Sequence, residues 1–291
     1  MSPLLLFVSL MLNGLGIGAI YALIALGFTL LWNTVQLVNF AQGDFTVIAM
    51  FLYLTCAVFL KLPLFLSVAL AIVGAAVAGI VLERAALRRV IGADPLAIVV
   101  VTLGVDIVIS NGAKLVYGPE PFAVPHFLGG DPLRVLGAVL TRENVWIIGI
   151  TLLAAVGFWW FTQFTFWGKA VRAISQDRDA AWLMGINVTG AIGLTFGVST
   201  GLAGLAGVLL APIIHVSADV GLSLLIKSFI AAVIGGFGNY LGAIVGGFLI
   251  GGIDVLTAFY VSSDYRDVIS FALLILVLLL RPSGLFGRAQ A

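Results

Sequence analysis

Cysteine, histidine and charged residues are all scarce in this 291-residue chain. Cys56 is the single cysteine, so no intramolecular disulfide can form, and the two histidines, His126 and His215, lie far apart near the ends of apolar segments. Such a set cannot build a cysteine or histidine metal cluster, so we predict no metal site and expect both histidines in interfacial loops. Charged residues make up 9% of the chain, and the net charge of +1 favours neither nucleic acid nor an acidic surface as a partner.

In place of charge the chain has apolar sequence: 62% of its residues are hydrophobic and its mean hydropathy is +1.21. Several runs reach or approach the length that crosses about 30 Å of hydrocarbon. These runs cover residues 4–32, 64–82, 96–116, 145–161, 191–214, 241–259 and 268–280. We therefore predict an all-α polytopic membrane protein, a single transmembrane domain over residues 1–291, with about eight to ten segments. Two shorter stretches, 45–60 and 224–235, fit tilted, broken or re-entrant helices.

More than half of the fourteen Lys and Arg residues gather in three places along the chain. They are Arg84, Arg88 and Arg89; Lys169, Arg172 and Arg178; and Arg281 and Arg288. The positive-inside rule places all three groups on the cytoplasmic side, so we expect the C-terminus there and the loop over residues 117–144 outside. The side of the N-terminus stays open, because residues 33–44 fit either a loop or a break within the membrane.

A polar segment over residues 165–190 interrupts the apolar runs on the cytoplasmic side. Within it, Asp179-Ala180-Ala181 is followed four residues later by Gly185, which predicts a short helix that ends at a glycine. The acidic side chain favours the helix N-terminus, and the small residues allow close contact. An ordered cytoplasmic helix between two membrane spans presents a surface to a partner protein.

Two further segments combine glycine with amide side chains inside apolar surroundings. The first holds Asn39, Gln42, Gly43 and Asp44, and the second holds Gly236, Gly238 and Asn239. This composition is expected where a helix breaks at membrane depth to line a pathway. An ordinary interfacial turn stays the alternative for both segments, and Asp44 can instead cap a helix that starts at Phe45.

Isolated charges lie within two apolar runs. Asp106 and Asp254 are each expected to face the helix bundle or a water-filled cavity, because a carboxylate exposed to lipid is costly. Two such groups are too few for a proton relay, so the sequence favours a structural or pathway-lining role for both aspartates. Residues 221–228 have the outline of a phosphate loop, but Ile226 replaces its second glycine, so we predict no nucleotide site.

Small residues spaced four apart, such as Gly14 and Gly18, predict helices whose backbones pack closely in lipid. Such faces indicate a tight bundle. They also fit contact with a second subunit.

Taken together, these segments resemble the branched-chain amino acid ABC permease family, the Liv-type membrane subunits of bacterial import systems. The motifs are NFAQGD at residues 39–44, GKAVRA at 168–173, DRDAA at 177–181 and AVIGGFGN at 232–239. In ABC importers the permease contacts its ATPase through a loop patterned Glu-Ala-Ala, three residues, Gly; here Asp179 replaces the glutamate and keeps its charge. The resemblance assigns ATPase coupling to Asp177, Arg178, Asp179, Ala180, Ala181 and Gly185.

The resemblance implies a permease subunit, without enzyme activity of its own, in an ATP-driven importer of branched-chain or other hydrophobic amino acids. The chain would form half of the translocation pathway in the bacterial inner (plasma) membrane and bind no cofactor. The implied partners are a second permease subunit (LivM-like), two cytoplasmic ABC ATPase subunits that use ATP and Mg, and a periplasmic substrate-binding protein.

Other functions fit parts of the same pattern. Relatives of this family import urea, amides or aromatic acids, and nothing in the sequence excludes these substrates. An ion-coupled secondary transporter would share the composition, but it should have more ionisable groups within the membrane. A membrane-embedded enzyme would need a clustered nucleophile or metal-ligand set, which the sequence does not indicate.

Overall fold

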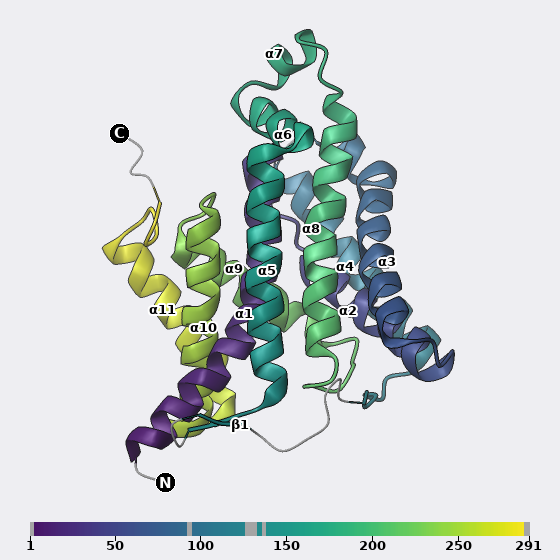
Figure 1. Cartoon of the computed structure of the whole chain (residues 1–291). Helices are drawn as coiled ribbons and strands as arrows, with labels where there is room; N and C mark the ends of the chain where they lie inside the picture. Colours follow the sequence, from purple (N-terminus) through teal and green to yellow (C-terminus); the bar gives the residue numbers. More distant parts are fainter. Residues whose placement is uncertain (1–2, 92–94, 126–132, 136–137, 288–291) are drawn as a thin grey trace. The chain divides into compact units, whose positions relative to one another are not determined.

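The computed structural model describes residues 3–91, 95–125, 133–135 and 138–287, so His126 and Arg288 lie outside the described residues. Helices dominate the described residues (Figure 1). The long helices are α1 (Pro3–Val35), α2 (Gln42–Leu54), α3 (Leu64–Ala85), α4 (Pro95–Tyr117), α5 (Arg142–Phe164), α8 (Val188–Leu210), α9 (Val220–Gly235), α10 (Tyr240–Tyr260) and α11 (Arg266–Leu280). Two shorter α-helices, α6 (Phe166–Gln176) and α7 (Arg178–Leu183), occupy the polar segment.

The remaining elements are short. A π-helical turn η1 (Thr55–Phe59) continues α2, and the 3-10 turns η2 (Leu87–Arg89) and η3 (Ser263–Tyr265) follow α3 and α10. Strands β1 (Leu133–Val135) and β2 (Ala138–Leu140) pair antiparallel and lie within the segment that the sequence places outside the membrane.

Seven of the described helices are long and apolar enough to cross a membrane: α1, α2 with η1, α3 with η2, α4, α5, α8 and α10. The two other apolar helices are shorter, with 16 residues in α9 and 15 in α11. The predicted all-helical polytopic fold is therefore confirmed. The stretch at 224–235 is part of the uninterrupted helix α9, whereas 45–60 changes from α-helix to π-helix at Thr55.

The chain folds into two compact units, and each unit is assembled from separate stretches of sequence. Unit 1 consists of Met1–Leu26, Pro125–Ala154 and Ile226–Ala291, and unit 2 consists of Gly27–Val124 and Ala155–Leu225. The division falls inside α1, α5 and α9.

Glycine faces hold unit 1 together, as the four-residue spacing predicts. A Cβ atom on Gly14 would lie 2.9 Å from the Cα of Gly252, and one on Gly18 would lie 2.7 Å from the Cα of Phe248. Real Cβ atoms essentially never come so close to backbone, so α1 and α10 can touch only where side chains are absent. Helices that pack this way gain van der Waals contact, which is the main force available between them in lipid.

Unit 2 is built around α8, which packs against α2 and α3. Gly204 of α8 faces Ala75 of α3, where a Cβ would come within 2.8 Å of the alanine methyl group. Gly207 of α8 faces the backbone carbonyl of Thr46 in α2. Figure 1 shows α6 and α7 beyond the end of unit 2 at which α8 begins. This arrangement leaves α7 projecting from the helices of unit 2.

Candidate functional site

The predicted short helix in the polar segment is present as α7 (Arg178–Leu183). Asp177 precedes it in an extended conformation, and its Oδ1 accepts hydrogen bonds from the backbone N–H groups of Asp179 and Ala180, each at 2.9 Å. Asp177 is therefore the N-cap, and it satisfies N–H groups that have no partner within the helix. Asp179 lies in the first turn of α7, as the sequence predicts, and the capping residue is Asp177 before it.

The other end of α7 closes at Gly185, as the sequence predicts. Gly185 has a φ of +82°, and its N–H donates to the carbonyl of Trp182 at 2.9 Å. Ile186 donates to the carbonyl of Ala181 at 3.1 Å. This pair of bonds is a Schellman motif, which needs a left-handed residue at the glycine position. Both ends of the six-residue helix are thus fixed by local hydrogen bonds.

The C-terminal end of α7 and its C-cap expose large apolar side chains, which the sequence analysis did not predict. Trp182, Leu183 and Met184 are 68%, 77% and 83% exposed, whereas Ala181 is buried at 4%. Adjacent exposed apolar side chains mark interaction sites more often than single ones do. The signal in the sequence is a run of three large apolar residues directly after Ala180-Ala181 within an otherwise polar segment. The structure therefore has an exposed apolar patch, Trp182, Leu183 and Met184, beside the residues Asp177, Arg178 and Asp179, which are also exposed.

The first glycine and amide segment is buried within unit 2: Asn39 lies between α1 and α2, and Gln42, Gly43 and Asp44 form the first turn of α2. The side chains of Asn39 and Gln42 are both 0% exposed. Gln42 Nε2 donates to the carbonyl oxygen of Ser199 at 3.1 Å and to its Oγ at 3.0 Å. Asn39 Oδ1 accepts from the N–H of Ala41, and Asn39 Nδ2 donates to Gln42 Oε1 at 3.4 Å. Gln42 therefore ties the start of α2 to α8, and Asn39 ties the preceding turn to the start of α2; the role of both amides in a pathway stays a prediction.

Asp44 lies in the first turn of α2 and is 1% exposed. The helix begins at Gln42, and neither carboxyl oxygen of Asp44 has a hydrogen-bond partner, so the alternative that Asp44 caps a helix is wrong. Its surroundings in unit 2 are Gly221, whose Cβ would lie 2.6 Å from Asp44 Oδ1, and the carboxyl group of Asp106, which interacts with it. Gly43 also approaches the backbone of Gly221, where no larger residue fits.

The second segment is a turn between α9 and α10 in unit 1, which is the alternative that the sequence left open. Gly236 and Gly238 have φ values of +105° and +95°, the left-handed conformation that glycine adopts freely. Asn239 caps α10 through Oδ1, which accepts from the N–H of Gly242 at 3.0 Å, and its Nδ2 donates to the carbonyl of Phe286 at 2.9 Å. Asn239 thus holds the turn and the end of the chain together.

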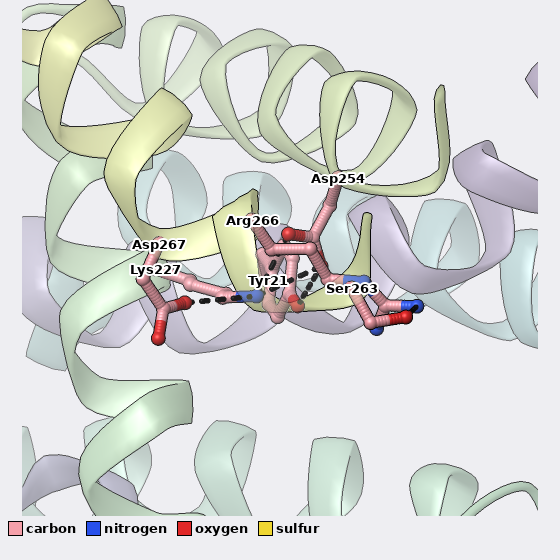
Figure 2. Close-up of polar contacts among 6 residues, drawn as sticks. All are labelled: Tyr21, Lys227, Asp254, Ser263, Arg266 and Asp267. Atoms are coloured by element: carbon pink, nitrogen blue, oxygen red, sulfur yellow. Dashed lines mark hydrogen bonds and ion pairs between the residues drawn. The ribbon is translucent and has the colours of Figure 1, made fainter. Parts of the chain in front are cut away.

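Asp254 is paired within unit 1, as its burial in an apolar run requires (Figure 2). Lys227 Nζ lies 2.7 Å from Asp254 Oδ1 and 2.9 Å from Oδ2, and the Tyr21 hydroxyl donates to Oδ2 at 3.0 Å. The sequence analysis considered Lys227 only within residues 221–228, which do not match a phosphate loop. Lys227 is part of the regular helix α9, so its backbone N–H is hydrogen-bonded within the helix.

Lys114, near the end of α4, also has a partner. Lys114 pairs with Asp219 at 2.5 Å within unit 2, and not with Asp106 on its own helix. Eight positions separate Lys114 from Asp106, which is about 12 Å along an α-helix and too far for a direct pair. Among the described residues, no three His, Cys, Asp or Glu side chains are grouped as metal ligands.

Comparison with known proteins agrees with this arrangement of helices. The family model described as "Branched-chain amino acid transport system / permease component" matches residues 10–278. The high-affinity branched-chain amino acid transport system permease protein LivH of Escherichia coli (strain K12) is 35% identical over 98% of this chain and 97% of its own length. The corresponding protein BraD of Pseudomonas aeruginosa is 33% identical over 96% and 95%.

Among solved structures, PsaBC from Streptococcus pneumoniae in complex with Fab is similar over 94% of this chain and 92% of its own, with a TM-score of 0.50 and 15% identity. At that identity the likeness concerns the fold alone. The family match and the relatives cover nearly the whole chain. The chain therefore belongs to the family of branched-chain amino acid transport system permease components.

Proposed function

We propose that this integral multi-pass permease is the membrane subunit through which an ATP-driven importer carries branched-chain or other hydrophobic amino acids. The observation that carries the proposal is α7, a six-residue helix fixed at both ends that exposes three apolar side chains. A helix this short is not stable alone, so the N-cap at Asp177 and the closure at Gly185 serve to hold its surface in one orientation. Such a preformed surface suits docking to a rigid partner.

The partner of α7 is a cytoplasmic ABC ATPase subunit, two of which hydrolyse ATP with Mg while this chain binds no cofactor. Asp177, Arg178, Asp179, Ala180, Ala181 and Gly185 form the coupling segment, with Trp182, Leu183 and Met184 added to it. This assignment places residues 165–190 and the C-terminus on the cytoplasmic side of the bacterial inner membrane, in agreement with the positive-inside rule.

The chain forms half of the translocation pathway and pairs with a second permease subunit related to it. A periplasmic substrate-binding protein delivers the substrate. The relatives LivH and BraD are named for branched-chain amino acid transport, which supports leucine, isoleucine and valine as the first substrates to test. The buried amides Asn39 and Gln42, with Gly43 and Asp44, and the turn residues Gly236, Gly238 and Asn239 are the pathway candidates.

The function is tested by uptake of radiolabelled leucine into vesicles from cells that express the chain with its neighbouring transport genes. We expect uptake that needs ATP and survives a proton ionophore while ATP is maintained. An ionophore that abolishes uptake without lowering ATP would indicate an ion-coupled transporter instead. Uptake of radiolabelled urea, acetamide or an aromatic acid, with no uptake of leucine, would instead show that these compounds are the substrate class.

The assembly is tested by expressing the chain with and without the second permease gene. Uptake that needs both genes supports a pair of different permease subunits. Full ATP-driven uptake from this chain and the ATPase alone would instead show that two copies of this chain suffice.

A further inference from the structure

Unit 1 contains a cluster of charged side chains that neither α7 nor the two amide segments involve. Its members come from four helices: Tyr21 from α1, Lys227 from α9, Asp254 from α10, and Arg266 and Asp267 from α11 (Figure 2). Two acids and two bases balance in charge, and the phenol supplies one more donor. In a largely apolar bundle such a group needs a reason, because charged side chains within a membrane are costly.

The inner part of this cluster is closed to solvent. The side chains of Lys227 and Asp254 are 7% and 3% exposed, and Tyr21 is 5% exposed. Both oxygens of Asp254 accept from Lys227, and one also accepts from Tyr21. Removing Lys227 would leave the buried Asp254 without its ammonium partner, and removing Asp254 would leave the buried Lys227 with only the exposed Asp267; both changes are unfavourable. This contact is therefore a permanent anchor that joins α9 to α10 and α1.

The outer part of the cluster is different in kind. Lys227 Nζ lies 3.3 Å from Asp267 Oδ1, and the side chain of Asp267 is 64% exposed. An exposed ion pair contributes little, because water solvates the separated charges well. One ammonium group therefore has a buried partner that it cannot leave and an exposed partner that it can.

Asp267 links the start of α11 to α9 through its ion pair with Lys227. Within α11 only Ser270 is buried, and its outer side chains, such as Leu279 at 78% and Leu280 at 73%, are exposed. Beyond its last residue the chain is tied to α9 again, where Leu285 and Phe286 donate backbone hydrogen bonds to the carbonyls of Ile234 and Gly235. The helix is thus linked to α9 at both ends. At its start the link to α9 is the Lys227–Asp267 ion pair, in addition to the short connection through η3 to α10.

We propose that Lys227 makes one permanent contact and one reversible contact, an arrangement that we call the latch. Asp254 and Tyr21 hold Lys227 inside unit 1, and its contact with Asp267 breaks and re-forms, so that the start of α11 is released and bound again during transport. The opening needs no change in the anchor, since Lys227 keeps both bonds to Asp254 when Asp267 leaves. The part that concerns transport rests on the proposed function, whereas the latch itself is tested without any transport measurement.

Ser270 offers a reporter, because it is 1% exposed, lies one turn after Asp267, and has an Oγ with no hydrogen-bond partner that a substitution would break. The full chain is prepared with Cys56→Ala and Ser270→Cys, so that the new thiol is its only one. Modification by N-ethylmaleimide is then followed by intact-protein mass. Asp267→Asn should speed the modification about two- to fivefold, the factor that an exposed ion pair contributes.

Asp264→Asn is the matched control, because Asp264 is an exposed aspartate in η3, just before α11. It should leave the modification rate as in the parent chain. Equal rates in the Asp267→Asn and Asp264→Asn chains would overturn the latch.

The anchor is tested separately by the amount of folded chain in the membrane. Asp254→Asn removes the buried counter-charge of Lys227 and should lower the amount of folded chain. The exchanged pair, Lys227→Asp with Asp254→Lys, should restore much of that amount. An Asp254→Asn chain that accumulates and resists heat as well as the parent would overturn the anchor.

In transport, Asp267→Asn should change the maximal rate of leucine uptake and leave the half-saturating concentration as it is, because Asp267 acts through the movement of α11. An unchanged maximal rate would overturn the link between the latch and transport. If the parent chain gives no ATP-driven uptake at all, the proposed function fails, and the thiol measurement still decides whether the latch exists.

Discussion

The backbone N–H of Ile186 donates to the carbonyl oxygen of Ala181 across 3.1 Å, and this bond closes α7 over Gly185. Ile186 can reach the carbonyl of Ala181 only because Gly185, the residue before it, is left-handed, with a φ of +82°. The orientation of the exposed apolar patch, Trp182, Leu183 and Met184, therefore depends on Gly185, although a Cβ on that glycine would meet nothing within 4 Å.

Replacing Gly185 with alanine should lower leucine uptake and ATPase coupling while the chain still inserts. A side chain in the left-handed conformation costs about 1–2 kcal/mol, which shifts the closed form of α7 by a factor of about 5–30. Uptake per inserted chain is the measurement. Gly157→Ala is the control, because Gly157 also has open space around it but lies within the regular helix α5. Equal uptake in both variants would refute the role of the turn.

Asp177→Ala should weaken coupling more than Asp179→Ala does. Only Asp177 accepts the two N–H bonds at the start of α7, and loss of an N-cap costs about 1 kcal/mol. Asp177→Asn keeps an accepting oxygen and should retain most of the uptake. The measurement is the ATPase activity that the permease stimulates. A larger loss in Asp179→Ala would show that Asp179, the acidic residue of the sequence motif, matters more for coupling than Asp177.

Trp182→Ser should reduce co-purification of the ATPase subunit severalfold and leave the thermal stability of the permease unchanged. The side chain is 68% exposed, so it contributes to docking without supporting the fold. Trp160→Ser on α5 is the control, because Trp160 is 58% exposed and lies in a membrane span. A similar loss of the ATPase in both variants would show that exposed tryptophans act nonspecifically.

Gln42→Leu should destabilise the permease by about 1–3 kcal/mol, since it leaves buried groups of Ser199 without their donor. Ser199→Ala removes one of the two acceptors and should cost less, because Gln42 Nε2 keeps its bond to the Ser199 carbonyl. Thermal unfolding in detergent is the measurement. If Gln42→Leu is as stable as the parent but transports less, Gln42 acts in the pathway and not in the scaffold.

Local features of this chain could be predicted from the sequence, and tertiary pairs could not. The helix before Gly185 follows from spacing alone, because a Schellman motif involves only neighbouring residues. The burial of Asp254 follows from the cost of a charge in lipid. Its partner Lys227 lies 27 positions away on another helix, and the spacing of residues within one helix says nothing about such a pair.

The two glycine and amide segments show the same division. Both contain the residues that a broken membrane helix would need, yet Asn39 and Gln42 are buried against α8, whereas Asn239 caps the next helix in a turn. Composition cannot separate these outcomes, because amides serve equally as caps and as buried ties. The pathway role of both segments, and the single transmembrane domain over 1–291, stay predictions.

The glycine joint between α1 and α10 has a mechanical consequence. Where Gly14 and Gly18 face Gly252 and Phe248, backbone meets backbone, so at these two points α1 has no side chain that could rearrange. Side-chain rearrangement is what lets packed helices slide past one another in small steps. The contact cannot slide in such small steps. The N-terminal part of α1 and the whole of α10 should therefore move as one rigid body in any motion that unit 1 makes.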